Sequence, residues 1–278
     1  ADEPSPPQAD PQMIRRTYVV GDLHGRIDLL RGMLRAIADH GEGKDARLIF
    51  LGDYVDRGPD SRLVVETMMA LCETRQVVCL KGNHEDMMHR ALVGGTVADY
   101  RAWIGSGGGA TLRSYGADSR EAARARVPAA HLRWMAGLPL TSGDGHRIYV
   151  HAGLAPGVAF ERQQPEHCLW IRDKFLKAPA EEFDAHIVHG HTPRWAGKQQ
   201  AAQPELLPHR TNLDSGAYET GALTAGVFDP DLPGGPLELL VVRDGGRKVS
   251  CEPAQIQAAP AEAPRRGLWR RLSRGALR

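Results

Sequence analysis

A chain of 278 residues, of which 42% are hydrophobic and 25% are charged, can build a sizeable core, and this composition excludes a collagen-like or wholly disordered protein. The 35 lysines and arginines balance 34 acidic residues, so the formal net charge of +1 gives no general attraction for nucleic acid or an anionic membrane. Any preference for phosphate must therefore come from a local arrangement of residues.

The four cysteines are scattered without a CxxC pair, which is typical of ordinary thiols in a reducing compartment. No apolar stretch is long enough to span a bilayer, and the first residues, ADEPSPPQADPQ, lack the apolar region of a secretory signal. We therefore expect a cytoplasmic protein. Because the chain begins with Ala1 instead of methionine, a signal that has already been cleaved off stays open as the alternative.

Residues 1–13 are rich in proline and acidic side chains, and we predict that they form a disordered leader. From Pro253 onward the composition turns to alanine, proline, glutamine and arginine. One folded domain is therefore expected over residues 14–252.

Five short apolar runs within this domain have the length and β-branched content of buried strands: residues 18–20, 48–51, 77–80, 148–150 and 187–188. Each run is followed at once by a polar sequence that contains glycine: GDLHG, GDYVDRG, KGNHE, HAG and GHT. Helical patterns over residues 27–37 and 64–71 separate the first three strands, as in βαβ units. We therefore predict an α/β fold whose polar clusters meet at the carboxyl ends of the strands.

The middle and the end of the domain follow a different pattern. Residues 87–138 are predicted to be mostly helical or irregular and to form a cap beside the site, with Trp103 in the core of that cap. The glycine-rich stretch 105–111 lacks the lysine of a P-loop, so no contact with substrate is expected there. The runs 223–228 and 237–242 read as strands that would complete a second sheet.

The last segment, residues 253–278, ends in PRRGLWRRLSRGALR. We interpret it as a solvated arginine-rich tail. The alternative is a short amphipathic helix that contacts a membrane surface or a partner.

The polar residues after the strands gain their meaning from their joint placement, because a single aspartate or histidine in such a position is usually a turn or structural residue. Asp22 and His24 alternate after the first strand, so their side chains can chelate one cation. The carboxylate of Asp53, after the second strand, can bridge two ions. The remaining strands are followed by Asn83, His151 and His191. Six such ligands exceed the need of one ion with an open position, so we predict two divalent ions, about 3.5–4 Å apart. Manganese, iron or zinc suits these oxygen and nitrogen donors.

In order and spacing, the motifs GDLHG (21–25), GDYVDRG (52–58), GNHE (82–85), HAG (151–153) and GHTP (190–193) resemble the signature series of the phosphoprotein phosphatases within the calcineurin-like metallophosphoesterases. The resemblance spans about residues 17–226. LWIRD (169–173) and NLDSGAYETGALTA (212–225) point to the bacterial serine/threonine protein phosphatase type. The resemblance implies a four-layer α/β/β/α sandwich with the site at the carboxyl ends of the strands.

The resemblance also implies a role for each site residue. The first metal would be bound by Asp22, His24 and Asp53, and the second by Asp53, Asn83, His151 and His191. His84 would be the general acid, oriented by Asp56, and Arg57 and Arg172 would clamp the phosphate. A hydroxide that bridges two ions, with manganese expected and iron or zinc as alternatives, would attack phosphorus directly. The histidine of GHT is the ligand in this family, which leaves His189 a structural residue.

Two related activities share these ligands. The first is removal of phosphate from serine or threonine, with tyrosine also open, so that the expected partner is a phosphoprotein or phosphopeptide. The alternative is hydrolysis of diadenosine tetraphosphate, but those hydrolases tend to lack the acid at Asp56 and to carry aspartate at Glu85. A third hypothesis, an inactive scaffold, is disfavoured because every expected ligand is retained. Since basic and aromatic residues do not interleave, we expect no nucleic-acid partner.

Overall fold

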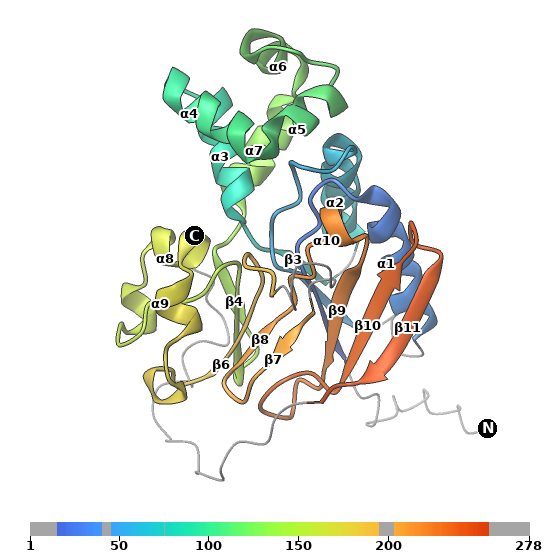
Figure 1. The fold of residues 1–278 in the computed structure, drawn as a ribbon, viewed down its shortest axis with the longest axis vertical. Coiled ribbons are helices and arrows are strands. Elements are labelled where there is room, and N and C mark those ends of the chain that lie inside the picture. Colours follow the sequence, from blue (N-terminus) through green and yellow to red (C-terminus); the bar gives the residue numbers. More distant parts are fainter. Residues whose placement is uncertain (1–15, 41–45, 75, 195–202, 256–278) are drawn as a thin grey trace, which may run out of the picture.

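The computed structural model describes residues 16–40, 46–74, 76–194 and 203–255 (Figure 1). The expected leader, residues 1–13, and the arginine-rich end of the tail lie outside these ranges. The last described strand ends at Pro253, one residue beyond the expected limit of the domain. Within the described residues, the structure contains no helix that is both long enough and apolar enough to cross a membrane.

The first sheet has six strands in the order β11-β10-β9-β1-β2-β3. β1, β2 and β3 are parallel, whereas β9, β10 and β11 continue the sheet by antiparallel pairing. The strands are β1 (Thr17–Val20), β2 (Arg47–Phe50), β3 (Val77–Cys79), β9 (Leu223–Phe228), β10 (Glu238–Arg243) and β11 (Lys248–Pro253).

The second sheet has five strands in the order β4-β5-β6-β8-β7, and its three central strands are parallel. Its strands are β4 (Thr141–Gly143), β5 (Arg147–Val150), β6 (His186–His189), β7 (Glu205–Leu206) and β8 (Arg210–Asn212). All five strands predicted from apolar runs are therefore present, three in the first sheet and two in the second.

The expectation that residues 223–228 and 237–242 complete a second sheet was wrong. Both segments are strands, but β9 pairs with β1, Val19 lying opposite Gly226, and β10 pairs with β9. The second sheet is completed instead by β4, β7 and β8, whose sequences TSG, EL and RTN carry little apolar pattern. β4 pairs with β5, β8 with β6, and β7 with β8, so these strands form through backbone hydrogen bonds to their neighbours rather than through a local hydrophobic signal.

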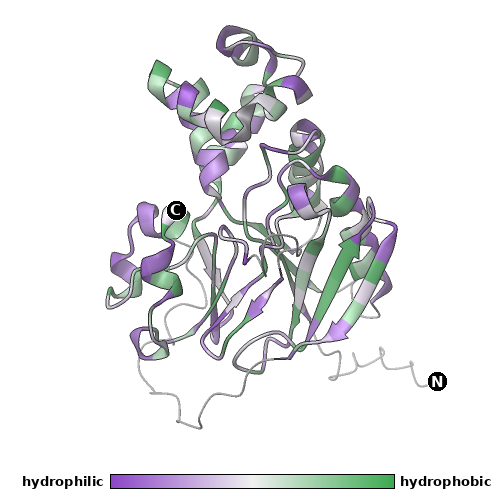
Figure 2. Ribbon diagram, viewed as in Figure 1, coloured by the Kyte–Doolittle hydropathy of each residue, from purple (hydrophilic) through white to green (hydrophobic). Residues whose placement is uncertain are grey.

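Successive side chains of a strand point to opposite faces of its sheet, so each strand contributes to two different core layers. Tyr18 and Val20 of β1 face a core that they share with helix α1, whereas Val19 between them faces the second sheet. In β5, Tyr149 lies in the core between the sheets, whereas Ile148 and Val150 lie in the core on the far side. Strands buried on both faces read as continuous apolar runs. Figure 2 shows the hydrophobic colouring of such strands most clearly on β9 and β10.

Helices cover the outer faces of both sheets. α1 (Ile27–Asp39) and α2 (Ser61–Thr74) pack on the first sheet. α8 (Pro165–Trp170) and α9 (Asp173–Leu176) lie beside the second. Short helical turns flank them at Phe160–Arg162 and Ala180–Glu182, and α10 (Ala217–Thr220) lies above β9 (Figure 1). The result is the expected four-layer α/β/β/α sandwich.

A helical cap rises above the sheets, as predicted for residues 87–138 (Figure 1). It has its own hydrophobic core, in which Trp103 is completely buried. Its helices are α3 (Asn83–Leu92), α4 (Val97–Trp103), α5 (Gly109–Ser114), α6 (Arg120–Arg126) and α7 (Ala129–Gly137), with a π-helical turn at Ile104–Gly108 between α4 and α5.

All four cysteines lie in the described part of the chain and are free thiols. Cys79 and Cys168 are buried, whereas Cys72 and Cys251 are exposed. Cys79 and Cys168 therefore match the expectation of small buried thiols, whereas Cys72 and Cys251 do not.

Candidate metal centre and active site

The six predicted metal ligands converge where the strands of both sheets end. None of them is more than 5% exposed. Those contributed by the first sheet are Asp22 and His24 after β1, Asp53 after β2 and Asn83 after β3; His151 and His191 follow β5 and β6 of the second sheet. The centre therefore exists only when the two sheets are packed together.

Asp53 lies at the middle of this cluster. Its Oδ2 is 3.4 Å from Nε2 of His24, and its Oδ1 is 3.3 Å from Nε2 of His151. Asp53 belongs to two clusters of residues whose side-chain atoms are spaced as metal ligands are. One cluster contains His24 and His84, and the other contains His151 and His191. A carboxylate common to two such groups has the placement that bridging requires.

The tautomers of the histidines show that a cation fits. Nδ1 of His24 donates to the carbonyl oxygen of Val55 at 2.9 Å, and Nδ1 of His151 donates to that of Leu51 at 2.9 Å. Burial lowers the pKa of both imidazoles, which favours the neutral form, in which Nε2 carries the lone pair. Each lone pair faces a carboxylate oxygen of Asp53, a repulsive arrangement that a metal ion between them would make attractive.

His191 and Asn83 complete the donor set. Nε2 of His191 is buried without a hydrogen-bond partner among the described residues, and burial lowers its pKa to about 2. Oδ1 of Asn83 lies 2.9 Å from Nε2 of His151, so two acceptors face one another. Oxygen and nitrogen donors of this kind suit divalent first-row metals.

The pKa shifts of the buried aspartates also indicate a site for cations. Burial raises the pKa of Asp22 well above its usual range, and Asp214 and Asp53 raise it further. Burial alone would also raise the pKa of Asp53, but the surrounding histidines, His151 first, hold it below its usual range. Divalent ions would relieve the repulsion between these carboxylates.

His84 and Asp56 form a buried pair beside the ligands. Nδ1 of His84 lies 2.7 Å from Oδ2 of Asp56, and Asp56 also accepts from Trp103 Nε1 at 2.9 Å and from Thr111 Oγ1 at 2.6 Å. Although burial alone would lower the pKa of His84, Asp53 and Asp56 outweigh it and raise that pKa. Nε2 of His84 is turned toward Asp53, 3.8 Å from its Oδ2.

The two arginines are the exposed members of the predicted set, and each donates a hydrogen bond to a predicted metal ligand, Arg57 to His24 and Arg172 to His191. Nη1 of Arg57 donates to Nε2 of His24 at 2.9 Å, and its guanidinium lies over the ring of Tyr218. Nη1 of Arg172 donates to Thr192 Oγ1 at 2.9 Å and to the carbonyl oxygen of His191. Both are therefore held within reach of an anion above the metal ligands.

Four residues of the site were not assigned these roles from the sequence. Glu85 accepts from the backbone N–H groups of Asp53, Tyr54, Val55 and Gly82 and so holds the loop that carries Asp53. Asp214 is buried behind β8, and burial raises its pKa to about 6. A polar residue after a strand is the signal that could have found Asp214. Trp103 and Thr111 had no such signal, because the cap brings them to Asp56 from a distant part of the chain.

His189 lies apart from the metal ligands. Its Nδ1 donates to the carbonyl oxygen of Gly190, its ring packs against Phe175, and burial lowers its pKa to about 3. The structure groups His191, rather than His189, with Asp53.

The backbone of the site is strained. Six non-glycine residues in the described ranges have a positive φ, and five of them are site residues: His24, Asp53, Asp56, Arg57 and His191. Such conformations cost of order 1–3 kcal/mol each and persist only where the surroundings impose them. The folded state is therefore less stable by this strain energy, and in return these side chains are oriented toward one point.

Two glycines allow the backbone to pass very close to the metal-binding aspartates. A Cβ at Gly190 would lie 2.0 Å from Oδ1 of Asp22, and one at Gly82 would lie 2.1 Å from Oδ1 of Asp53. Both distances are far below van der Waals contact, so a side chain at either position would displace a metal ligand.

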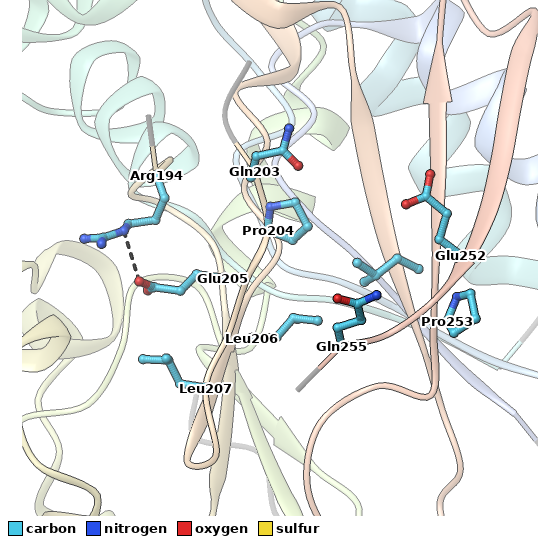
Figure 3. A pocket seen from close by; sticks show the side chains of 10 residues that line it. Arg194, Gln203, Pro204, Glu205, Leu206, Leu207, Glu252, Pro253 and Gln255 are labelled. Atoms are coloured by element: carbon cyan, nitrogen blue, oxygen red, sulfur yellow. Dashed lines mark ion pairs between the residues drawn. The ribbon is translucent and has the colours of Figure 1, made fainter. Parts of the chain in front are cut away.

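A cavity of about 790 Å³ lies elsewhere, between β7 and the end of β11 (Figure 3). Its charged lining residues are Arg194, Glu205 and Glu252, and Arg194 and Glu205 form an ion pair at 3.1 Å. None of the predicted site residues lines it.

Several known proteins resemble this chain in sequence or in fold. The model of the calcineurin-like phosphoesterase family matches residues 15–217. Bis(5'-nucleosyl)-tetraphosphatase PrpE of Anoxybacillus flavithermus is 28% identical over 229 residues, which cover 74% of this chain and 88% of that protein. Serine/threonine-protein phosphatase 2 of Escherichia coli is 33% identical over 213 residues, which cover 76% and 91%. A cold-active protein tyrosine phosphatase has a similar fold, with a TM-score of 0.54 at 17% identity over 86% of this chain and 78% of that one.

We expect Asp53→Asn to lower the occupancy of both metal positions and to remove nearly all hydrolytic activity, because one negative charge shared by both positions is lost. Metal analysis of the purified variant measures the effect. Asp244→Asn is the matched control, since Asp244 also has a positive φ but lies in an exposed turn. Two fully occupied positions with normal turnover in Asp53→Asn would show that Asp53 does not bridge.

We expect Gly190→Ala to reduce metal occupancy and to cost on the order of 10²-fold in activity, because its Cβ would push Asp22 out of place. Gly137→Ala is the control, since a Cβ there meets nothing within 4 Å. Equal activity and metal content in the two variants would contradict the close packing of Gly190 on Asp22.

Proposed function

Because the chain belongs to the calcineurin-like phosphoesterase family, we propose that it is a phosphoprotein phosphatase that hydrolyses phosphoserine and phosphothreonine, with phosphotyrosine as a further substrate. The His84–Asp56 pair is the observation that carries this proposal. Phosphate esters of alcohols place a demand on the enzyme that this pair can meet.

That demand is a proton for the departing oxygen. A serine or threonine alkoxide is a strong base, so the ester bond breaks readily only if an acid protonates the oxygen as it leaves. The nucleotide phosphate that departs from a dinucleoside polyphosphate is a far weaker base and needs no such acid.

His84 is arranged to act as this acid. Since its Nδ1 is bonded to Asp56, the proton that it can give away sits on Nε2, which is turned toward Asp53. Asp56 is completely buried and is fixed by Trp103 and Thr111, so it cannot swing away from the imidazole. Asp53 and Asp56 outweigh burial and raise the pKa of His84, which favours the protonated imidazole that an acid requires.

The other residues would bind and orient the phosphate. Arg57 and Arg172 present guanidinium groups that match two phosphate oxygens each. Two divalent ions, for which we propose manganese, would be held by Asp22, His24, Asp53, Asn83, His151 and His191 and would supply Lewis acidity and an activated water. No covalent phosphoenzyme is required by this set of residues.

Hydrolysis of diadenosine tetraphosphate is the second candidate, and the likeness to the tetraphosphatase PrpE of Anoxybacillus flavithermus favours it. The highest identity quoted above, however, is to a serine/threonine phosphatase. Glu85 also supports a phosphatase, because its two oxygens reach four backbone N–H groups. An aspartate, shorter by one methylene, could not reach all four and would demand a different loop around Asp53.

A direct comparison of substrates tests the proposal. We expect phosphoserine and phosphothreonine peptides to be hydrolysed with a higher kcat/KM than diadenosine tetraphosphate, in the presence of Mn²⁺. Asp53→Asn is the control for contaminating enzymes and should be inactive on every substrate. A preference for diadenosine tetraphosphate of tenfold or more would replace the proposed function with the second candidate.

We expect His84→Asn to retain both metals and to lose roughly 10²- to 10⁴-fold on a phosphoserine peptide, the usual scale of general acid catalysis. The loss on para-nitrophenyl phosphate should be clearly smaller, because nitrophenolate needs little protonation. Asp56→Asn should show the same dependence in weaker form. The measurement is the slope of rate against leaving-group pKa for a series of aryl phosphates, which should be steeper in His84→Asn.

His89→Asn, on the same helix but outside the site, is the control and should keep the slope of the unmodified protein. Parallel slopes for His84→Asn and the unmodified protein, or loss of metal from the variant, would make His84 a ligand instead of an acid.

A further inference from the structure

A second group of metal-ligand side chains lies on the first sheet, separate from the centre around Asp53. We propose that His40, Glu238 and Cys251 form a binding site for a transition-metal ion, and that zinc is the ion that suits them best. Their ligand atoms all lie within 4.8 Å of one another.

The two sites are at opposite ends of α1. This helix begins beside the metal centre, just after His24, and its 13 residues extend over roughly 20 Å. His40 is the residue that caps its carboxyl end. The helix thus carries His40 to the edge of the sheet where β1 begins.

Strand pairing places the other two ligands beneath His40. Cys251 of β11 lies opposite Leu240 of β10, and Glu238 precedes Leu240 by two residues. Glu238 and Cys251 are therefore diagonal neighbours on one face of the sheet, the face on which Leu240 packs against α1. Nε2 of His40 lies 3.2 Å from Oε2 of Glu238 and 3.6 Å from Sγ of Cys251.

Tyr18 supports His40 from the other side of its ring. The hydroxyl of this buried tyrosine lies 2.9 Å from Nδ1 of His40 and 3.4 Å from the carbonyl oxygen of the same residue. When Nε2 binds a metal ion, Nδ1 carries the hydrogen and can donate it to this hydroxyl. A hydrogen bond to the far nitrogen of a ligating histidine is the usual support of metal sites.

The donor atoms select the metal. An imidazole nitrogen, a carboxylate oxygen and a thiolate sulfur together suit zinc, which completes a tetrahedron with a water molecule. The adjoining hollow of about 540 Å³, lined by Asp39, His40 and Cys251 among others, leaves room for that water. On binding, the thiol of Cys251 would release its proton to the solvent.

Cobalt(II) titration of the reduced, metal-free protein tests the site independently of any enzymatic activity. Cobalt bound to a thiolate has a charge-transfer absorption in the near ultraviolet, whereas the proposed ligands around Asp53 contain no sulfur. We expect this band to appear in the unmodified protein with the intensity of one thiolate-bound cobalt per chain, whatever further cobalt the ligands around Asp53 take up, and to disappear when excess zinc is added.

Variants assign the band to its ligands. Cys251→Ser should abolish it, and His40→Gln should weaken cobalt binding by at least about tenfold. Tyr18→Phe should keep the band but weaken binding roughly 10- to 100-fold, the usual cost of losing such a supporting hydrogen bond. Cys72→Ser, which changes the other exposed cysteine, is the matched control and should leave the band unchanged.

Two results would overturn the proposal. One is the absence of the band at saturating cobalt in the unmodified protein, which would leave His40 and Glu238 as an ion pair beside a thiol. The other is a band of equal strength in Cys251→Ser, which would place the cobalt on other cysteines.

Discussion

The structure depends on one buried carboxylate. Asp53 is almost inaccessible to solvent, and histidines from both sheets surround it. An isolated charge at such a depth costs several kcal/mol, so it persists only where hydrogen bonds or cations, here the proposed metal ions, compensate it. His24 approaches from the first sheet and His151 from the second, which makes the packing of the sheets and the assembly of the centre a single event. The left-handed backbone at Asp53, and the glycine that approaches it at position 82, follow from the need to reach this point.

The cap participates in the site instead of merely lying beside it. Trp103 and Thr111 hold Asp56, and the carbonyl oxygen of Gly107 accepts from the backbone N–H of Arg57. The glycine-rich stretch 105–111 therefore has a role, although not as a phosphate loop: a Cβ at Gly107 would clash with Arg57. Through these contacts the cap fixes both the orientation of the proposed acid, His84, and the backbone position of Arg57, which is proposed to bind phosphate. Changes in cap packing would thus reach the chemistry without touching a metal ligand.

The two candidate metal sites differ in the chemistry of their donors. The centre around Asp53 uses oxygen and nitrogen atoms from loops after strands, whereas the second group adds the sulfur of Cys251 and lies near the surface. A strained, buried centre suits reactivity, because its geometry is imposed by the fold. The second group joins the end of α1 to β10 and β11, and a metal there would stabilise that junction. Softer ligands in the second group also make it the preferred place for zinc when harder ions occupy the first.

The sequence by itself determined what is local. A buried strand needs an apolar run, and a site at its end needs polar residues and glycine directly after it. Five of the six parallel strands, β1, β2, β3, β5 and β6, and the ligands that follow them could therefore be located from the sequence. Only the tertiary structure decided several other features. β9 and β10 pair within the first sheet, and Trp103 donates a hydrogen bond to Asp56. Glu85 accepts from the backbone of the Asp53 loop, and His40 lies beside Cys251. Most of these contacts join residues that are far apart in the chain, and the short sequences around them are compatible with several partners. Only the burial of all layers at once selects among those partners, because each unpaired backbone group or exposed apolar face costs free energy wherever it lies in the sequence.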